Sequence, residues 1–78
     1  MTEEDMARIA LNNVRQEEAA RAFTRAGGED KGQRRGHLII KMPNGMRLSL
    51  PTGTLREGLL RSEIKKAGLT PEQFEELL

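Results

Sequence analysis

The sequence contains no cysteine, no tryptophan and no tyrosine among its 78 residues. The lack of cysteine excludes a disulfide framework and thiolate chemistry. The lack of large aromatic side chains argues against the stacking platforms on which many proteins hold single-stranded nucleic acid. The single histidine has no second ligand at metal-binding spacing, and no glycine-rich nucleotide-binding motif is present. We therefore expect no metal site and no cofactor.

Long apolar runs are also missing. No segment approaches the roughly 18 apolar residues of a membrane-spanning helix, and the acidic residues 1–10 are unlike a secretory signal. We therefore expect a cytoplasmic protein without membrane contact. A chain of this length builds one small core, so any chemistry is expected on an exposed face or in a shallow groove.

The net charge of +1 hides a segregation of charge along the chain. Residues 30–66 carry nine Lys and Arg against three Asp and Glu, whereas residues 1–29 carry four against six and residues 67–78 none against three. A basic middle between acidic ends is typical of a face that binds a polyanion. A solvated charged surface explains the same counts, so composition alone leaves both interpretations open.

The hydrophobic pattern divides the first half of the chain into an extension, a helix and a strand. Residues 1–13 form an extension that a short amphipathic helix could occupy, and the domain itself is expected over 14–78. Residues 16–26 carry alanines and Phe23 at helical spacing, and the Gly-Gly pair that follows supplies a left-handed stop. A polar edge strand is predicted over 29–35.

Two hairpin registers are possible around the Pro-Asn-Gly sequence at positions 43–45. A two-residue Asn-Gly loop would set Ile40 opposite Ser49, which places an apolar residue beside a polar one. A three-residue loop sets Ile40 opposite Leu48 and joins apolar residues in every pair. The second register predicts one apolar face that helices must cover, made of Leu38, Ile40, Met42, Met46, Leu48 and Leu50.

The opposite face of this hairpin gathers polar residues. Alternation places His37, Lys41 and Arg47 there, together with Ile39 and Ser49. The only histidine of the chain is thereby expected to share a solvent-facing surface with two cations.

Two helices complete the predicted domain. The first spans about residues 58–67 and turns its apolar side inward. The second begins with residue types typical of an N-cap, a first helical position and a capping box, which are Thr70, Pro71 and Gln73. Its buried side is expected to hold Phe74, Leu77 and Leu78. The pattern as a whole predicts an α+β fold, a three-stranded antiparallel sheet with helices packed on one face.

Several short motifs follow one another in a familiar order. They are Gly36 with His37, the aliphatic strand Leu38–Lys41, the turn of Pro43 and Gly45, the proline-ended strand Leu48–Pro51, the leucine-rich segment Leu55–Lys66, and Ala67–Thr70 followed by Glu72 and Phe74. Each motif alone is widespread. Their ordered set resembles the core of HicA-type toxins, small ribonucleases of bacterial toxin–antitoxin pairs. Residues 17–29 resemble the first helix of that family and its glycine stop, so the likeness covers roughly residues 14–78.

The resemblance implies a fold similar to double-stranded-RNA-binding domains and an activity that cleaves messenger RNA. It assigns the catalytic role to His37 and implies inhibition by a HicB-type antitoxin. One position departs from the family pattern, which commonly reads Gly-Ser-His. Here Arg35 and Gly36 precede His37, so the hydroxyl neighbour is missing.

The residue types of the basic segment are suited to the cleavage of RNA. An imidazole can take the proton of a ribose 2′-hydroxyl or return one to the leaving oxygen, and nearby cations can stabilise the developing phosphorane. The residues expected to bind RNA are Arg34, Arg35, Lys41, Arg47, Arg61 and Lys65, of which Arg35 and Lys41 are expected closest to the phosphate. Three hypotheses follow: a metal-independent endoribonuclease, a non-catalytic RNA-binding module, and a protein-interaction domain with a basic face. A solvated histidine is the ordinary alternative for His37.

Overall fold

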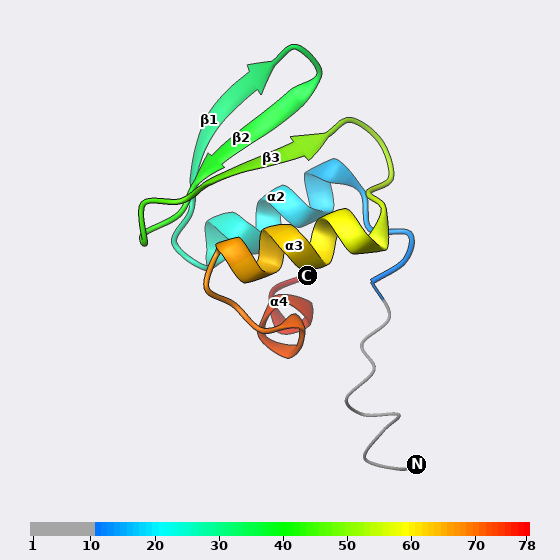
Figure 1. Cartoon of the computed structure of the whole chain (residues 1–78), viewed down its shortest axis with the longest axis vertical. Coiled ribbons are helices and arrows are strands. Elements are labelled where there is room, and N and C mark those ends of the chain that lie inside the picture. The colour runs from blue at the N-terminus through cyan, green and yellow to red at the C-terminus, as the bar shows by residue number, and fades with distance from the viewer. Residues whose placement is uncertain (1–10) are drawn as a thin grey trace.

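In the computed structural model, which describes residues 11–78, an antiparallel sheet lies above a layer of helices (Figure 1). The elements follow in the order α2 (Gln16–Arg25), β1 (Glu29–Arg34), β2 (His37–Lys41), β3 (Arg47–Pro51), α3 (Glu57–Lys66) and α4 (Pro71–Leu77). The strands are ordered β1-β2-β3 in the sheet, and the helices cover one face of it. The predicted α+β fold class is confirmed. The helix predicted within residues 1–13 falls largely on residues 1–10, which lie outside the described part of the chain.

The hairpin of β2 and β3 has the register that the Pro-Asn-Gly loop predicts. Ile40 lies opposite Leu48, and the backbone N–H of Met42 donates to the carbonyl oxygen of Met46 at 2.8 Å. Gly45 has a φ of 87°, the left-handed value that such a loop needs before the second strand. Met46, predicted to be buried, is 42% exposed because it lies in the loop before β3 begins.

The hairpin of β1 and β2 closes through a two-residue turn that the sequence pattern did not predict. Arg35 and Gly36 both have positive φ, 53° and 82°, which is the combination of a type I′ turn. Arg34 consequently lies directly opposite His37. The predicted strand over 29–35 therefore ends one residue early, because its last residue belongs to the turn.

A bulge interrupts β1 near its middle. The register with β2 shifts between Asp30 and Gln33, and the N–H of Gly32 donates to the side chain of Asp30 at 2.7 Å. The extra residue brings Gln33 to the helical side of the sheet, where its amide donates to the buried Gln16 of α2 at 3.1 Å. The bulge therefore decides which residues of this polar strand face solvent and which face the helices.

The core lies between the inner face of the sheet and the helices. Phe23 of α2 and Phe74 of α4 are fully buried and contact each other with ring centroids 5.0 Å apart. Leu11 is also fully buried, so the core includes a residue that the sequence pattern assigned to the extension before residue 14. Leu78, predicted to be buried, is 44% exposed, since it follows the last residue of α4.

The two C-terminal helices begin and pack largely as their motifs predict. The Thr70 hydroxyl accepts from the N–H of Gln73 at 3.1 Å, and the Gln73 side chain accepts from the N–H of Thr70 at 2.9 Å. This reciprocal pair is the predicted capping box. No helix within residues 11–78 is long and apolar enough to cross a membrane.

Helix α3 covers the outer edge of β3 with a buried carboxylate. Glu63 is only 6% exposed and accepts a hydrogen bond from the backbone N–H of Ser49 at 2.8 Å. Lys66, one turn along the helix, forms an ion pair with Glu63 at 3.1 Å. An edge amide that would otherwise lack a partner is thereby satisfied by a side chain.

Candidate functional site

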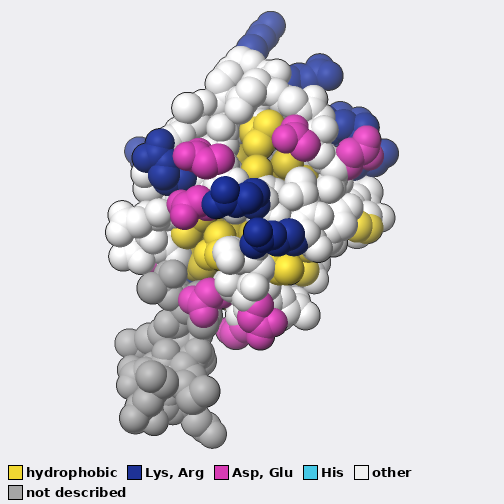
Figure 2. Space-filling view, turned by 180° about the vertical axis from the view of Figure 1, so that it is seen from behind, with side chains coloured by type: hydrophobic (Ala, Val, Ile, Leu, Met, Phe, Trp, Pro, Cys, Tyr) yellow, Lys and Arg dark blue, Asp and Glu magenta, His cyan; other side chains and the backbone are white. Residues whose placement is uncertain are grey.

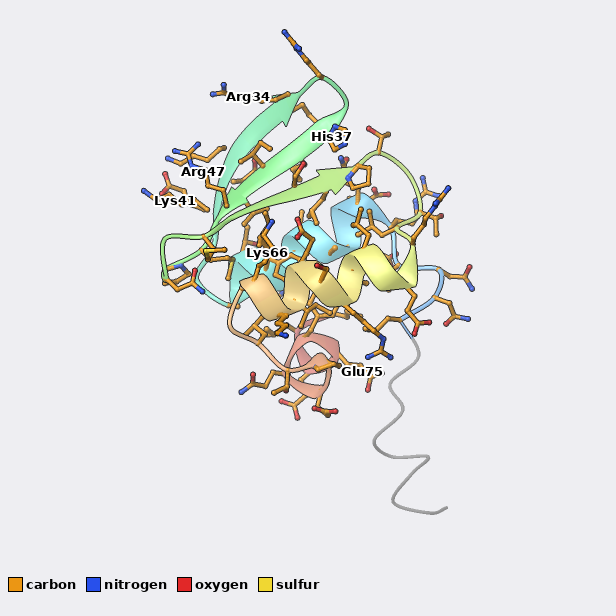
Figure 3. The ribbon with its side chains drawn as sticks, viewed as in Figure 1. Arg34, His37, Lys41, Arg47, Lys66 and Glu75 are labelled. Atoms are coloured by element: carbon orange, nitrogen blue, oxygen red, sulfur yellow. The ribbon has the colours of Figure 1, made fainter. Side chains whose placement is uncertain are left out.

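The side of the sheet away from the helices, which we call the open face, carries charged residues of all three strands. Its residues are Glu29, Lys31, Arg34, His37, Ile39, Lys41, Arg47, Ser49 and Pro51. Four of them are cations and one is a carboxylate, so this surface carries an excess of positive charge. Figure 3 shows Arg34, Lys41 and Arg47 extending from the sheet away from the helical layer.

His37 lies at one end of the open face, between Arg34 on β1 and Pro51 on β3. Its Nδ1 is 3.3 Å from the carbonyl oxygen of Arg35, a long hydrogen bond. Because a carbonyl oxygen can only accept, this contact favours, of the two neutral tautomers, the one with the proton on Nδ1. Nε2 is then left as a proton acceptor, which is the form that a general base requires.

The backbone immediately before His37 is braced by the loop that follows β3. The carbonyl oxygen of Gly36 accepts from the hydroxyl of Thr52 at 2.7 Å and from its backbone N–H at 3.1 Å. Thr52 was not singled out in the sequence, although the hairpin register that sets Pro51 opposite His37 also places residue 52 beside residue 36. The structure thus brings a hydroxyl to the backbone next to His37 from a distant part of the chain.

Lys41 lies at the other end of the open face, between Glu29 on β1 and Arg47 on β3. It is four residues from His37 along β2, roughly 13 Å at the usual rise of an antiparallel strand. The two side chains therefore occupy separate positions along the sheet. The cation that lies directly opposite His37 is Arg34, and not the Lys41 that the sequence analysis expected closest to the phosphate.

The one carboxylate of the open face belongs to Glu29, which forms an ion pair with Lys31 at 2.8 Å. The hydrogen bond from Lys31 and its positive charge, with a smaller contribution from Lys41, hold the pKa of Glu29 below its ordinary value. Glu29 therefore stays ionised at neutral pH. It partly offsets the positive charge at the Lys41 end of the face.

Arg61 and Lys65 lie on α3, apart from the open face. Each is two residues from Glu63, and two residues turn a helical side chain by roughly 200°. Because Glu63 reaches the edge of β3, these two cations point to the other side of the helix. Arg61 also forms an ion pair with Glu57 at 3.0 Å. The structure thus separates them from the four predicted RNA-binding residues of the sheet and its turn.

A groove of about 460 Å³ runs between α2 and β1, on the helical side of the sheet. Its lining includes Ala20, Arg21 and Thr24 from the helix and Asp30 and Gln33 from the strand. Figure 2 views the molecule from behind and shows apolar side chains framed by acidic and basic ones, with no histidine visible on this side. The mixed charge of the groove gives it no preference for a polyanion.

Within residues 11–78, no group of three or more His, Asp or Glu side chains is placed to hold a metal ion. No protein-family model matches the chain, and no curated protein or solved structure matches it either. The likeness to HicA-type toxins therefore stays a prediction from the ordered motifs. What the chain offers for a functional assignment is the geometry of the open face.

Proposed function

We propose that this protein is a cytoplasmic endoribonuclease of the HicA toxin type, which cleaves messenger RNA and is inhibited by a HicB-type antitoxin. The observation that carries the proposal is the position of His37. It is the only histidine of the chain, it is exposed on a cationic sheet face, and its Nδ1 lies 3.3 Å from the carbonyl oxygen of Arg35. The element order and the motifs that resemble the family support the same assignment.

In this proposal the reaction is attack by a ribose 2′-hydroxyl on the adjacent phosphorus. Nε2 of His37 takes the hydroxyl proton while the 2′-oxygen bonds to phosphorus. The bond to the 5′-oxygen then breaks, and that oxygen leaves with its electron pair and takes a proton from water. The hydroxide so formed removes the proton from His37 and restores the base. The products are a 2′,3′-cyclic phosphate and a 5′-hydroxyl end. The guanidinium of Arg34, opposite His37, and that of Arg35, at the turn beside it, stabilise the charge of the phosphorane.

The test compares the purified wild-type protein with His37→Ala on an unstructured RNA, in the presence of a chelator. Loss of the general base is expected to slow cleavage by about 100-fold or more, with RNA affinity little changed. His37 is exposed, so the variant is expected to keep its circular dichroism spectrum and its midpoint of unfolding. Arg21→Ala, which removes an exposed cation of α2, is the control and should cleave at the wild-type rate.

The same pair of proteins is then expressed from an inducible promoter in a bacterial host. Growth arrest and loss of bulk message are expected for the wild type and not for His37→Ala. If the wild type leaves growth and message intact, and the purified protein does not cleave RNA, the ribonuclease proposal is wrong.

A non-catalytic RNA-binding module is the second candidate, and one observation favours it. The cross-strand neighbours of His37 are Arg34 and Pro51, so neither is a second acid–base group that could protonate the leaving oxygen. In that case RNA binds without being cut, and His37→Ala changes neither affinity nor growth. Binding by such a module depends on the cations of the open face alone.

A further inference from the structure

Three of the four cations of the open face, all but the ion-paired Lys31, lie at its two ends. Arg34 and His37 form one end, and Lys41 and Arg47 lie opposite each other at the other. Between them is Ile39, a half-buried apolar residue in the middle of β2. The open face therefore carries positive charge at both ends. Between them lie Ile39 and, on the bulge of β1, Lys31, whose charge is paired with Glu29 at 2.8 Å.

The pair at the second end is free to bind a ligand. Among the described residues, the side chains of Lys41 and Arg47 take part in no hydrogen bond and no ion pair, and both residues are exposed. Glu29 lies across from Lys41, but its carboxylate is bound by Lys31 at 2.8 Å. The two adjacent cations repel each other, and Glu29, which is ion-paired with Lys31, offsets their charge only in part. A further anion placed between Lys41 and Arg47 relieves the remaining repulsion.

The distance between the two ends matches a spacing of the RNA backbone. Four residues of β2 span roughly 13 Å. An extended single strand spaces its phosphates at roughly twice the 3.4 Å interval of a duplex strand, so two nucleotides cover the same length. Attack by a 2′-hydroxyl requires the attacking oxygen, phosphorus and leaving oxygen to be in line, which a stacked A-form helix does not allow. The nucleotide at His37 must therefore be unstacked.

We propose that Lys41 and Arg47 form a phosphate subsite that holds single-stranded RNA two nucleotides away from the bond cleaved at His37. The inference rests on the proposed function. It adds that the substrate is single-stranded and that its backbone runs along β2. The strand lies over Ile39, which contacts a ribose or a base. Since Phe23 and Phe74 are buried in the core, no aromatic side chain stacks on the bases, and the subsite recognises the backbone without regard to sequence.

The first experiment measures binding without cleavage. The probes are oligouridylates of two to eight nucleotides with 2′-fluoro sugars, which lack the attacking hydroxyl. For the wild type, affinity is expected to rise in a step when the oligonucleotide reaches about four nucleotides, the shortest length with phosphates at both ends of the face. In the double variant Lys41→Ala/Arg47→Ala the step disappears. The slope of log Kd against log salt for the octamer is expected to fall by about 0.7, the value for one phosphate contact on a single strand.

Arg21→Ala is the matched control, because it removes a cation that belongs to α2 rather than to the open face. It should retain the step and the wild-type salt slope. The inference is overturned if the step survives in the double variant, or if the double variant binds the dinucleotide and the octamer with equally reduced affinity. Tighter binding of an RNA duplex than of the single strand, with the same dependence on Lys41 and Arg47, also overturns it in favour of a duplex ligand.

The second experiment separates this inference from the proposed function. On cleavable RNA, the double variant is expected to raise KM for long substrates several-fold and to leave kcat and the cleavage of short substrates unchanged. If the wild type cleaves RNA but its affinity shows no length step, the subsite is wrong and the ribonuclease proposal is unaffected. A length step in binding without any cleavage contradicts the ribonuclease and leaves the subsite standing.

Discussion

The two faces of β2 show how one short strand serves both the core and the candidate site. On the inner face Leu38 and Ile40 are 7% and 0% exposed, whereas His37 and Lys41 on the same strand are exposed. Because side chains alternate across a strand, a slip of one residue would exchange the two sets. The apolar pairs of the inner face therefore determine which residues point to solvent on the other. In this protein the position of the candidate site is a consequence of core packing.

The largest effect on stability is expected from a substitution on the inner face of β2. Ile40→Ala leaves a cavity in the core and should lower the free energy of unfolding by about 2–5 kcal/mol. Ile39→Ala, one residue away on the open face, should cost less than about 1 kcal/mol. Urea denaturation followed by circular dichroism measures both. Equal losses would mean that the two faces of β2 are not as different as their exposure indicates.

A smaller effect on stability is expected at the edge of β3, where the buried side chain of Glu63 accepts a hydrogen bond from a backbone amide. Glu63→Ala leaves the amide of Ser49 without its acceptor, and should cost about 1–3 kcal/mol in the free energy of unfolding. Glu63→Gln keeps an acceptor oxygen and should recover much of that loss. Glu57→Ala removes an exposed carboxylate of the same helix and should cost less than about 1 kcal/mol. If Glu63→Ala and Glu57→Ala have the same stability, the edge hydrogen bond is not important.

The smallest effect is expected from Glu29→Gln, which removes the only carboxylate of the open face. RNA affinity should rise modestly, most clearly at low salt, because the charge that opposes phosphate is gone. The pKa of Glu29 is lowered in the folded protein, so its stabilising contribution is present above its ordinary pKa and is lost as pH falls through the lowered value. The variant should therefore unfold with a weaker dependence on pH in the acidic range. Reduced RNA affinity in Glu29→Gln would contradict this account of the face.

Much of the fold could be predicted because a few residues determine it locally. The Pro-Asn-Gly sequence restricts the loop to two registers, and the apolar pairing of Ile40 with Leu48 selects one of them. The start of α4 is equally local, since the Thr70 side chain bonds the backbone three residues away. The presence of His37 on a face with Lys41 and Arg47 followed directly from that register.

Other features could not be predicted because they depend on contacts between distant residues. Arginine is an uncommon residue at positive φ, so Arg35 gave no sign of a turn, and the pairing of Arg34 with His37 was missed with it. The burial of Glu63 depends on an edge amide of β3 that only the packed structure brings near. The direction in which Arg61 and Lys65 point follows from that same contact. Because the contact cannot be seen in the sequence, these two cations were predicted to bind RNA together with those of the sheet.

The two edges of the sheet are closed in different ways, and this bears on how the chain behaves when it is concentrated. On β3 the amide of Ser49 is bound by Glu63, and on β1 a bulge directs the amide of Gly32 to Asp30. Neither edge offers the regular row of free amides and carbonyls on which strands of separate molecules assemble. We therefore expect both edges to hinder the addition of a strand from a second molecule, although the strand interiors contain no proline.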